Sequence, residues 1–186
     1  MDDSTPAPFP LISLIVCLTL CFLVAFVGSQ ASIMGLQGWY QTLNKPVLNP
    51  PGWVFAPVWT VLYLMMGVAL WQVWRSEPSS LRSWGLSLFG LQLVLNGLWS
   101  WLFFAWHKLP LAFWEIVLLD LAILATILVF AKVRSSAAWL LVPYLAWCCF
   151  ASLLSFGIWR MNIESSTPQD GDIKIEVGNS DNLPLP

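Results

Sequence analysis

The chain has 186 residues, of which 58% are hydrophobic and only 10% are charged. Thirteen residues are tryptophan, and the mean hydropathy is +0.73. This composition excludes an ordinary water-soluble domain and indicates a protein of the lipid bilayer. The net charge of -2 provides no basic surface, so we expect no nucleic-acid partner.

Five long stretches that are nearly free of charge divide the chain, at residues 9–31, 54–74, 84–106, 109–131 and 137–159. A helix needs about 20 apolar residues to cross a hydrocarbon core, and each stretch is long enough. None shows the alternation of period two that is typical of a membrane barrel strand. We therefore predict an all-α, multi-pass integral membrane protein, a bundle of five transmembrane helices within residues 9–162.

A short polar N-terminus, residues 1–8, precedes the first span and contains two aspartates but no lysine or arginine. A secretory signal peptide begins with a positively charged region, so we interpret residues 9–31 as a retained helix. Lysine and arginine are divided four against three between the two ends of the predicted bundle. This difference is too small to decide the orientation in the membrane.

The connection between the first two spans, residues 32–53, is long and contains Trp39, Tyr40 and three prolines. Connections of more than about 12 to 15 residues are usually functional or disordered. The aromatic side chains have apolar surface to bury, and the prolines stiffen the backbone. We therefore predict a long structured loop that covers one end of the bundle. The second helix would begin near Val54 and carry Pro57 in its first turn.

Three predicted helices each carry aromatic and polar side chains on one face. In chain order these residues are Phe55, Trp59 and Tyr63; Asn96, Trp99 and Ser100; and Tyr144, Trp147, Ala151 and Ser155. Spacings of three and four residues place each set on one side of its helix. The polar members could instead join helices through hydrogen bonds. With Trp39 and Tyr40 in the loop above, the three faces predict a cleft for a flat, largely apolar ligand.

Glu115 and Asp120 are the charged residues inside the predicted spans, and such residues are often functional. Five residues along a helix correspond to about 140° of rotation, which argues against a catalytic pair. Glu115 lies near the helix start, where the helix dipole favours an anion. For Asp120 we expect a protonated carboxyl or a hydrogen bond to a neighbouring helix.

Four cysteines, Cys17, Cys21, Cys148 and Cys149, lie at predicted membrane depth, where we expect them to pack as small hydrophobic residues. The single histidine, His107, lies in a turn and has no partner of metal-ligand spacing. We therefore expect no metal site and no required cofactor. The final segment, residues 163–186, is polar and acidic, and its composition predicts a disordered tail.

Taken together, these residues resemble the TspO/MBR family, the tryptophan-rich sensory proteins of bacteria and the translocator proteins, or peripheral-type benzodiazepine receptors, of mitochondria. The resemblance covers residues 39–162. It rests on Trp39, Tyr40, Leu43, Lys45 and Pro46; on Pro50, Pro51, Gly52, Trp53, Phe55, Pro57, Val58, Trp59, Thr60 and Tyr63; on Leu95, Asn96, Trp99, Ser100, Phe103 and Phe104; and on Pro143, Tyr144, Trp147, Phe150, Ala151, Ile158 and Trp159. It implies a five-helix bundle, commonly a homodimer, with a pocket formed by the first, second and fifth helices beneath the first loop.

The resemblance also implies a function, the binding of porphyrins and other flat apolar molecules. We expect a membrane-embedded tetrapyrrole-binding protein that acts as a sensor, regulator or carrier. Some bacterial relatives degrade protoporphyrin in light, and Trp59 and Trp147 match the tryptophans associated with that reaction, so a porphyrin-degrading enzyme is the alternative. A small-molecule transporter is a second alternative, although inverted repeats are absent. One departure concerns the pocket, because many relatives carry Asn where this chain has Ser155.

Overall fold

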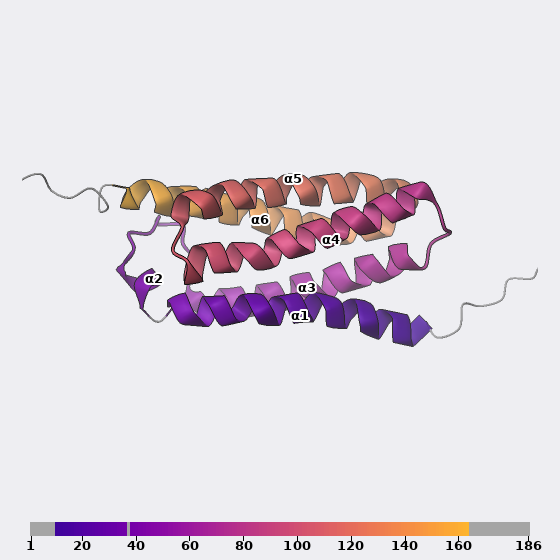
Figure 1. The fold of residues 1–186 in the computed structure, drawn as a ribbon, viewed down its shortest axis with the longest axis horizontal. Helices are drawn as coiled ribbons and strands as arrows, with labels where there is room; N and C mark the ends of the chain where they lie inside the picture. The colour runs from indigo at the N-terminus through magenta and orange to yellow at the C-terminus, as the bar shows by residue number, and fades with distance from the viewer. Residues whose placement is uncertain (1–9, 37, 164–186) are drawn as a thin grey trace, which may run out of the picture.

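The computed structural model describes residues 10–36 and 38–163, and within them all regular structure is helical. The long helices are α1 (Pro10–Leu36), α3 (Gly52–Trp74), α4 (Ser80–Ser100), α5 (Leu109–Val133) and α6 (Ser135–Asn162). A four-residue helix, α2 (Trp39–Thr42), lies in the connection after α1, and a π-helix, η1 (Trp101–Ala105), extends α4. The long helices lie side by side along one axis (Figure 1). The predicted all-α bundle of five membrane-length helices is confirmed.

Several helices extend beyond the predicted apolar spans, because polar residues at their ends continue the helix. Helix α4 begins at Ser80, where the Ser79 hydroxyl accepts a hydrogen bond of 3.1 Å from the backbone N–H of Arg82. Such an N-cap satisfies one of the free donors at a helix start. The predicted N-terminus, residues 1–8, and the predicted tail, residues 163–186, lie outside the described residues, except for Ile163.

Helix α3 starts earlier than the sequence predicts, at Gly52 rather than near Val54. A hydrogen bond of 3.0 Å from the Val54 N–H to the Pro51 carbonyl forms a turn that leads into the helix. Pro57 therefore lies inside α3 and not in its first turn as expected. Because proline has no N–H, it leaves the backbone carbonyl of Trp53 without its usual helical partner.

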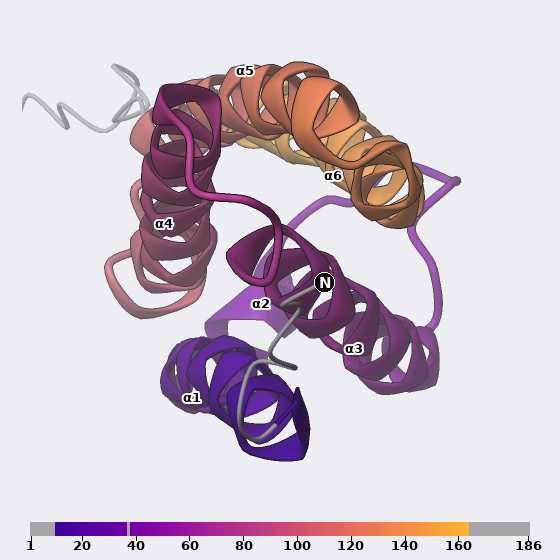
Figure 2. The same cartoon turned by 90° about the vertical axis from the view of Figure 1, so that its right-hand side faces the viewer.

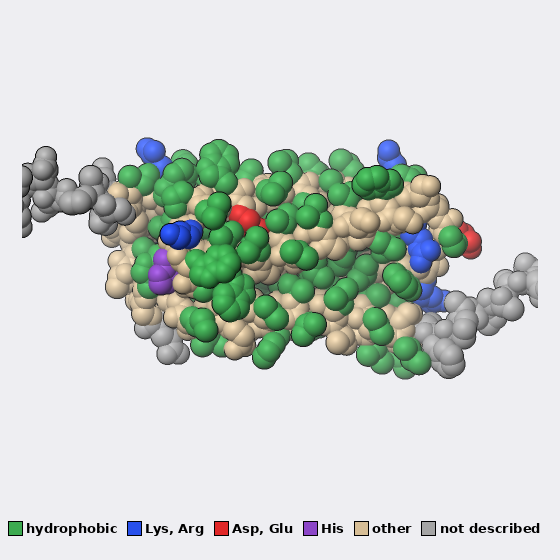
Figure 3. All heavy atoms as spheres, viewed as in Figure 1, with side chains coloured by type: hydrophobic (Ala, Val, Ile, Leu, Met, Phe, Trp, Pro, Cys, Tyr) green, Lys and Arg blue, Asp and Glu red, His purple; other side chains and the backbone are tan. Residues whose placement is uncertain are grey.

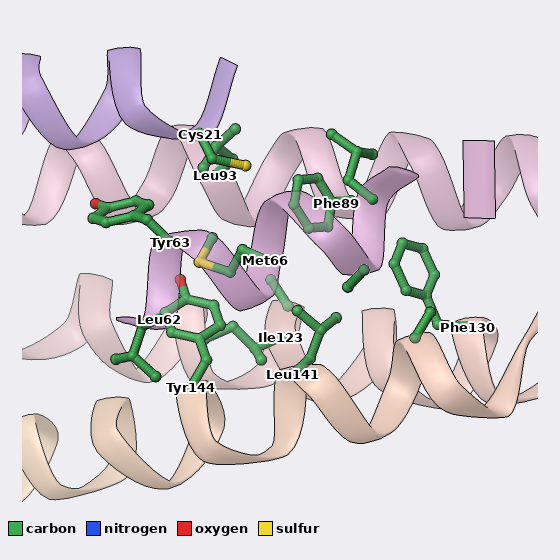
Figure 4. Packing of buried hydrophobic residues seen from close by; sticks show 14 of the residues in the cluster. Cys21, Leu62, Tyr63, Met66, Phe89, Leu93, Ile123, Phe130, Leu141 and Tyr144 are labelled. Carbon is green, nitrogen blue, oxygen red and sulfur yellow. The ribbon is translucent and has the colours of Figure 1, made fainter. Parts of the chain in front are cut away.

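The helices form a closed ring in the order α1, α3, α6, α5 and α4, with α4 returning to pack on α1 (Figure 2). The core lies between these helices and contains residues from all five (Figure 4). At its centre, Met66 of α3 is completely buried, and Tyr144 of α6 packs near it. Toward the end opposite α2, the rings of Phe89 and Phe130 stack at 5.9 Å and join α4 to α5.

The face of the bundle seen in Figure 3 is largely apolar along its length, whereas lysine and arginine side chains lie near its two ends. Leu23, Leu121 and Leu153, for example, are each more than half exposed. Exposed leucine along a helix is expected where the surrounding solvent is lipid. The distribution therefore agrees with five helices that cross the bilayer.

We expect that Gly35→Ala destabilises the bundle by about 1 to 3 kcal/mol, as overpacking does. A Cβ atom at Gly35 would lie 2.6 Å from the backbone carbonyl oxygen of Phe104, so α1 would have to move away from η1. Gly90→Ala is the matched control, because nothing lies within 4 Å of a Cβ atom there. Thermal unfolding in detergent measures both changes. Equal unfolding midpoints for the two variants would contradict the close approach of α1 and η1.

Candidate functional site

A cavity of about 820 Å³ lies inside the bundle, beneath the connection between α1 and α3. Its size falls within the range of about 300 to 1,000 Å³ that is typical of small-molecule sites. Residues of α1, α3, α4, η1 and α6 form its walls, and the connection forms its roof. Among the described residues, α5 contributes none to the lining.

The structure brings ten of the twelve predicted site residues together around this cavity. They are Tyr40, Phe55, Trp59, Tyr63, Asn96, Trp99, Ser100, Trp147, Ala151 and Ser155. Phe55 of α3 meets Trp147 of α6 edge-on at 6.0 Å between ring centres, so aromatic faces from two helices adjoin. Contact of these residues with a ligand stays a prediction.

Trp39 and Tyr144 do not line the cavity but support residues that do. Trp39 stacks on His107 at 4.0 Å between ring centres and so attaches the roof to the turn before α5. Tyr144 is completely buried, and its hydroxyl donates a hydrogen bond of 2.9 Å to Gln92. Its ring meets the ring of Trp59 edge-on at 6.3 Å. Helical spacing places Tyr144 on the same side of α6 as Trp147, but it cannot show which residue faces the empty space.

Helix α1 forms a wall that the residue patterns, apart from the family resemblance, do not predict. Phe22, Phe26, Ser29 and Ile33 line the cavity and follow one another at spacings of four, three and four. A Cβ atom at Gly28 would lie 3.3 Å from the Ser100 hydroxyl, so this glycine allows α1 to approach α4 closely. The signal in the sequence was the glycine and serine residues within an otherwise apolar helix, which are typical of helix contacts in membranes.

Asn96 combines the two roles that its position in the sequence left open. It lines the cavity, and its side-chain oxygen accepts a short hydrogen bond from the Tyr63 hydroxyl. This bond joins α4 to α3 while keeping both polar groups away from lipid. Ser155 also lines the cavity, but its hydroxyl oxygen is covered by neighbouring atoms and has no hydrogen-bond partner among the described residues. The wall is therefore largely apolar at Ser155.

The roof is a structured lid, defined here as residues 38–51, as predicted. Its Asn44 exchanges two hydrogen bonds with the Asn162 side chain at the end of α6, of 3.1 and 3.0 Å. Pro46 lies over Gly157, where a Cβ atom would be only 2.6 Å from the proline ring. The Tyr40 hydroxyl donates a hydrogen bond of 2.9 Å to Asn49 and so ties the two ends of the lid together.

Lys45 and Tyr40 form the polar part of the roof. The Lys45 ammonium donates hydrogen bonds to the backbone carbonyls of Leu43 at 3.2 Å and Gln41 at 3.5 Å. It also lies 4.8 Å from the centre of the Tyr40 ring, within reach of a cation–π interaction. Burial raises the pKa of Tyr40, and the hydrogen bond to Asn49 opposes this shift. The phenol is therefore neutral at physiological pH, and it places no negative charge beside Lys45.

The two carboxyl groups of α5 lie outside the cavity lining. Asp120 accepts a hydrogen bond of 2.7 Å from the Ser152 hydroxyl, which joins α5 to α6 as one of our two alternatives expected. Glu115 is buried, and neither of its carboxyl oxygens has a hydrogen-bond partner in the described structure. Neither residue is placed for acid–base chemistry on a ligand in this cavity.

The fold and the cavity define a class of protein: a five-helix membrane bundle with an aromatic small-molecule cavity beneath a structured loop. Comparison with known proteins identifies the family. The TspO/MBR family matches residues 17–160, and the chain belongs to this family. It is therefore a multi-pass integral membrane protein.

Curated relatives match most of the chain. The tryptophan-rich protein TspO of Chlorobaculum tepidum is 42% identical over 156 residues, which cover 82% of this chain and 97% of the relative. The tryptophan-rich sensory protein of Cereibacter sphaeroides is 36% identical, covering 78% and 91% respectively. The human translocator protein is 38% identical, covering 74% and 82%.

We expect that Asn162→Ala loosens the lid, because it removes both hydrogen bonds to the backbone of Asn44. Hydrogen exchange of the amides in residues 38–49 should become faster, while exchange in α5 should not change. Arg160→Ala serves as the control, since Arg160 is exposed near the same end of α6. Unchanged exchange in the lid of the Asn162 variant would show that other contacts hold it in place.

Proposed function

We propose that this protein binds a tetrapyrrole in the cavity beneath the lid and acts as a sensor, regulator or carrier of porphyrin-type molecules. The observation that carries the proposal is the aromatic lining, to which α1, α3, α4, η1 and α6 all contribute rings. Aromatic side chains bind a flat conjugated ring by stacking and edge contacts. The name of the Cereibacter sphaeroides relative, a sensory protein, supports the sensor role.

The polarity of the cavity also favours a largely apolar ring as the ligand. Below the lid, its described wall contains no lysine, arginine, aspartate, glutamate or histidine. The hydrogen bond from the Tyr63 hydroxyl pairs it with the Asn96 oxygen, and the other polar groups of the wall below the lid are neutral. A charged group placed deep in this cavity would lose its hydration without a partner, which is costly. A ligand with an extended apolar surface therefore suits the cavity best.

Titration of the purified protein with protoporphyrin in the dark tests the proposal, with quenching of tryptophan fluorescence as the readout. We expect that Trp147→Ala weakens binding by about 2 kcal/mol or more, as the loss of a central aromatic contact does. Trp139→Ala is a control on the same helix, because Trp139 is 70% exposed and does not line the cavity. Equal affinities of the two variants, or no saturable binding by the wild type, would contradict tetrapyrrole binding at this site.

A second candidate function is the light-dependent degradation of porphyrin, because Trp59 and Trp147 both line the cavity. Both indole rings could exchange electrons with a photoexcited ligand bound between them and α1. We expect that Trp59→Phe and Trp147→Phe keep most of the dark affinity, since an aromatic wall remains. If the protein is an enzyme, illumination in air converts the bound ligand to a new product with the wild type only. Equal bleaching by the variants, or by empty detergent micelles, would leave binding without chemistry.

A further inference from the structure

Lys45 is the one charged side chain among the described residues that line the cavity. It projects from the lid, whereas the walls below it carry only aromatic, aliphatic and neutral polar side chains. Lys108 and Arg160 are exposed at the same end of the bundle but do not line the cavity. Of these three basic residues at the same end of the bundle, only Lys45 therefore places its charge beside the cavity.

The structure holds the Lys45 ammonium in a defined position. Backbone carbonyls of Leu43 and Gln41 accept two hydrogen bonds from it, and the Tyr40 ring lies against it. An ammonium has three donors, so these two bonds leave one N–H for another acceptor. Lys45 is half-buried, and none of the three acidic residues of the described chain, Glu77, Glu115 and Asp120, lines the cavity. The Lys45 ammonium thus lies beside a cavity that no described carboxylate lines.

We propose that Lys45 makes the cavity selective for flat aromatic acids, with the ligand carboxylate at the lid and the ring below it among the aromatic side chains. This inference rests on the proposed function in that a porphyrin carrying propionate groups is one such acid. It goes further, because it assigns the anion-binding residue, the orientation of the ligand and a preference for acids over neutral rings of the same shape.

Two physical effects support this orientation. A hydrogen bond between an ammonium and a carboxylate is stronger than a neutral hydrogen bond, and it gains strength where water is partly excluded. The deep wall offers only neutral groups, so the reverse orientation would bury the carboxylate without a cation beside it. The carboxylate of the ligand is therefore favoured beside the lid and disfavoured in the deep part of the cavity.

Two ligand pairs test the proposal, because the members of each pair share a ring but differ in charge. The first pair is protoporphyrin and its dimethyl ester, and the second is 1-pyrenebutyrate and 1-pyrenebutanol. Each is titrated in the dark against the full-length wild type, Lys45→Gln, Lys45→Arg and Lys108→Gln in the same detergent. The measured quantity is the ratio of acid to neutral affinity for each protein. Comparing this ratio between variants removes the unequal partition of acids and neutral ligands into micelles.

We expect Lys45→Gln to lower the ratio about five- to twentyfold by weakening only the acids. Lys45→Arg should largely restore it, and Lys108→Gln should leave it unchanged. Equal weakening of acid and neutral ligands would instead show that Lys45 only supports the lid, and an unchanged ratio would exclude the anion site; either result overturns the proposal. If the pyrene pair shows the effect but protoporphyrin does not bind, the anion site stands and the tetrapyrrole proposal fails.

Discussion

The lipid environment is the constraint on which this structure depends. In hydrocarbon, backbone groups can hydrogen-bond only within the protein, so a chain without the alternating pattern of barrel strands crosses as helices. The same solvent reverses the usual surface rule, because leucine can face outward while polar side chains are drawn inward. Gln92, Asn96 and Thr126 are accordingly buried, whereas Leu23 and Leu153 are exposed. The burial of these few polar side chains within a hydrophobic core is therefore a consequence of the apolar surroundings of the bundle.

Several of these inward-facing polar groups find partners on neighbouring helices. Tyr63 bonds to Asn96, Tyr144 to Gln92, and Ser152 to Asp120. These bonds join α3 to α4, α6 to α4, and α6 to α5. Near the lid, α1, α3, α4 and α6 instead leave a space of about 820 Å³. Small residues such as Ala25 and Ala151 in the wall help to keep this space open. The bundle is thus densely packed at one end and hollow at the other.

The lid closes the hollow end through ring stacking, hydrogen bonds and a close proline–glycine contact. Trp39 stacks on His107, Asn44 bonds to Asn162, and Pro46 packs over Gly157. Together these contacts attach the lid to the turn before α5 and to the end of α6. The lid is also the part of the cavity that carries a charge. Its position at the end of the bundle allows a cation there without the cost of placing it at membrane depth.

Whether a feature of this structure could be predicted from the sequence depends on whether it arises within one segment or from packing between segments. Apolar length and helical spacing predicted the five helices and the aromatic faces of α3, α4 and α6. The length of residues 32–53 and their aromatic and proline content predicted the structured lid, and all of these are local patterns. The place of α1 in the cavity wall was implied by the family resemblance and by no local pattern. Tertiary structure alone decided that Tyr144 lies behind Trp59 rather than beside the empty space. It also decided that Lys45, and not Lys108, faces the cavity. Such choices depend on how the helices rotate and pack against one another, and helical spacing within one segment carries no information about that rotation.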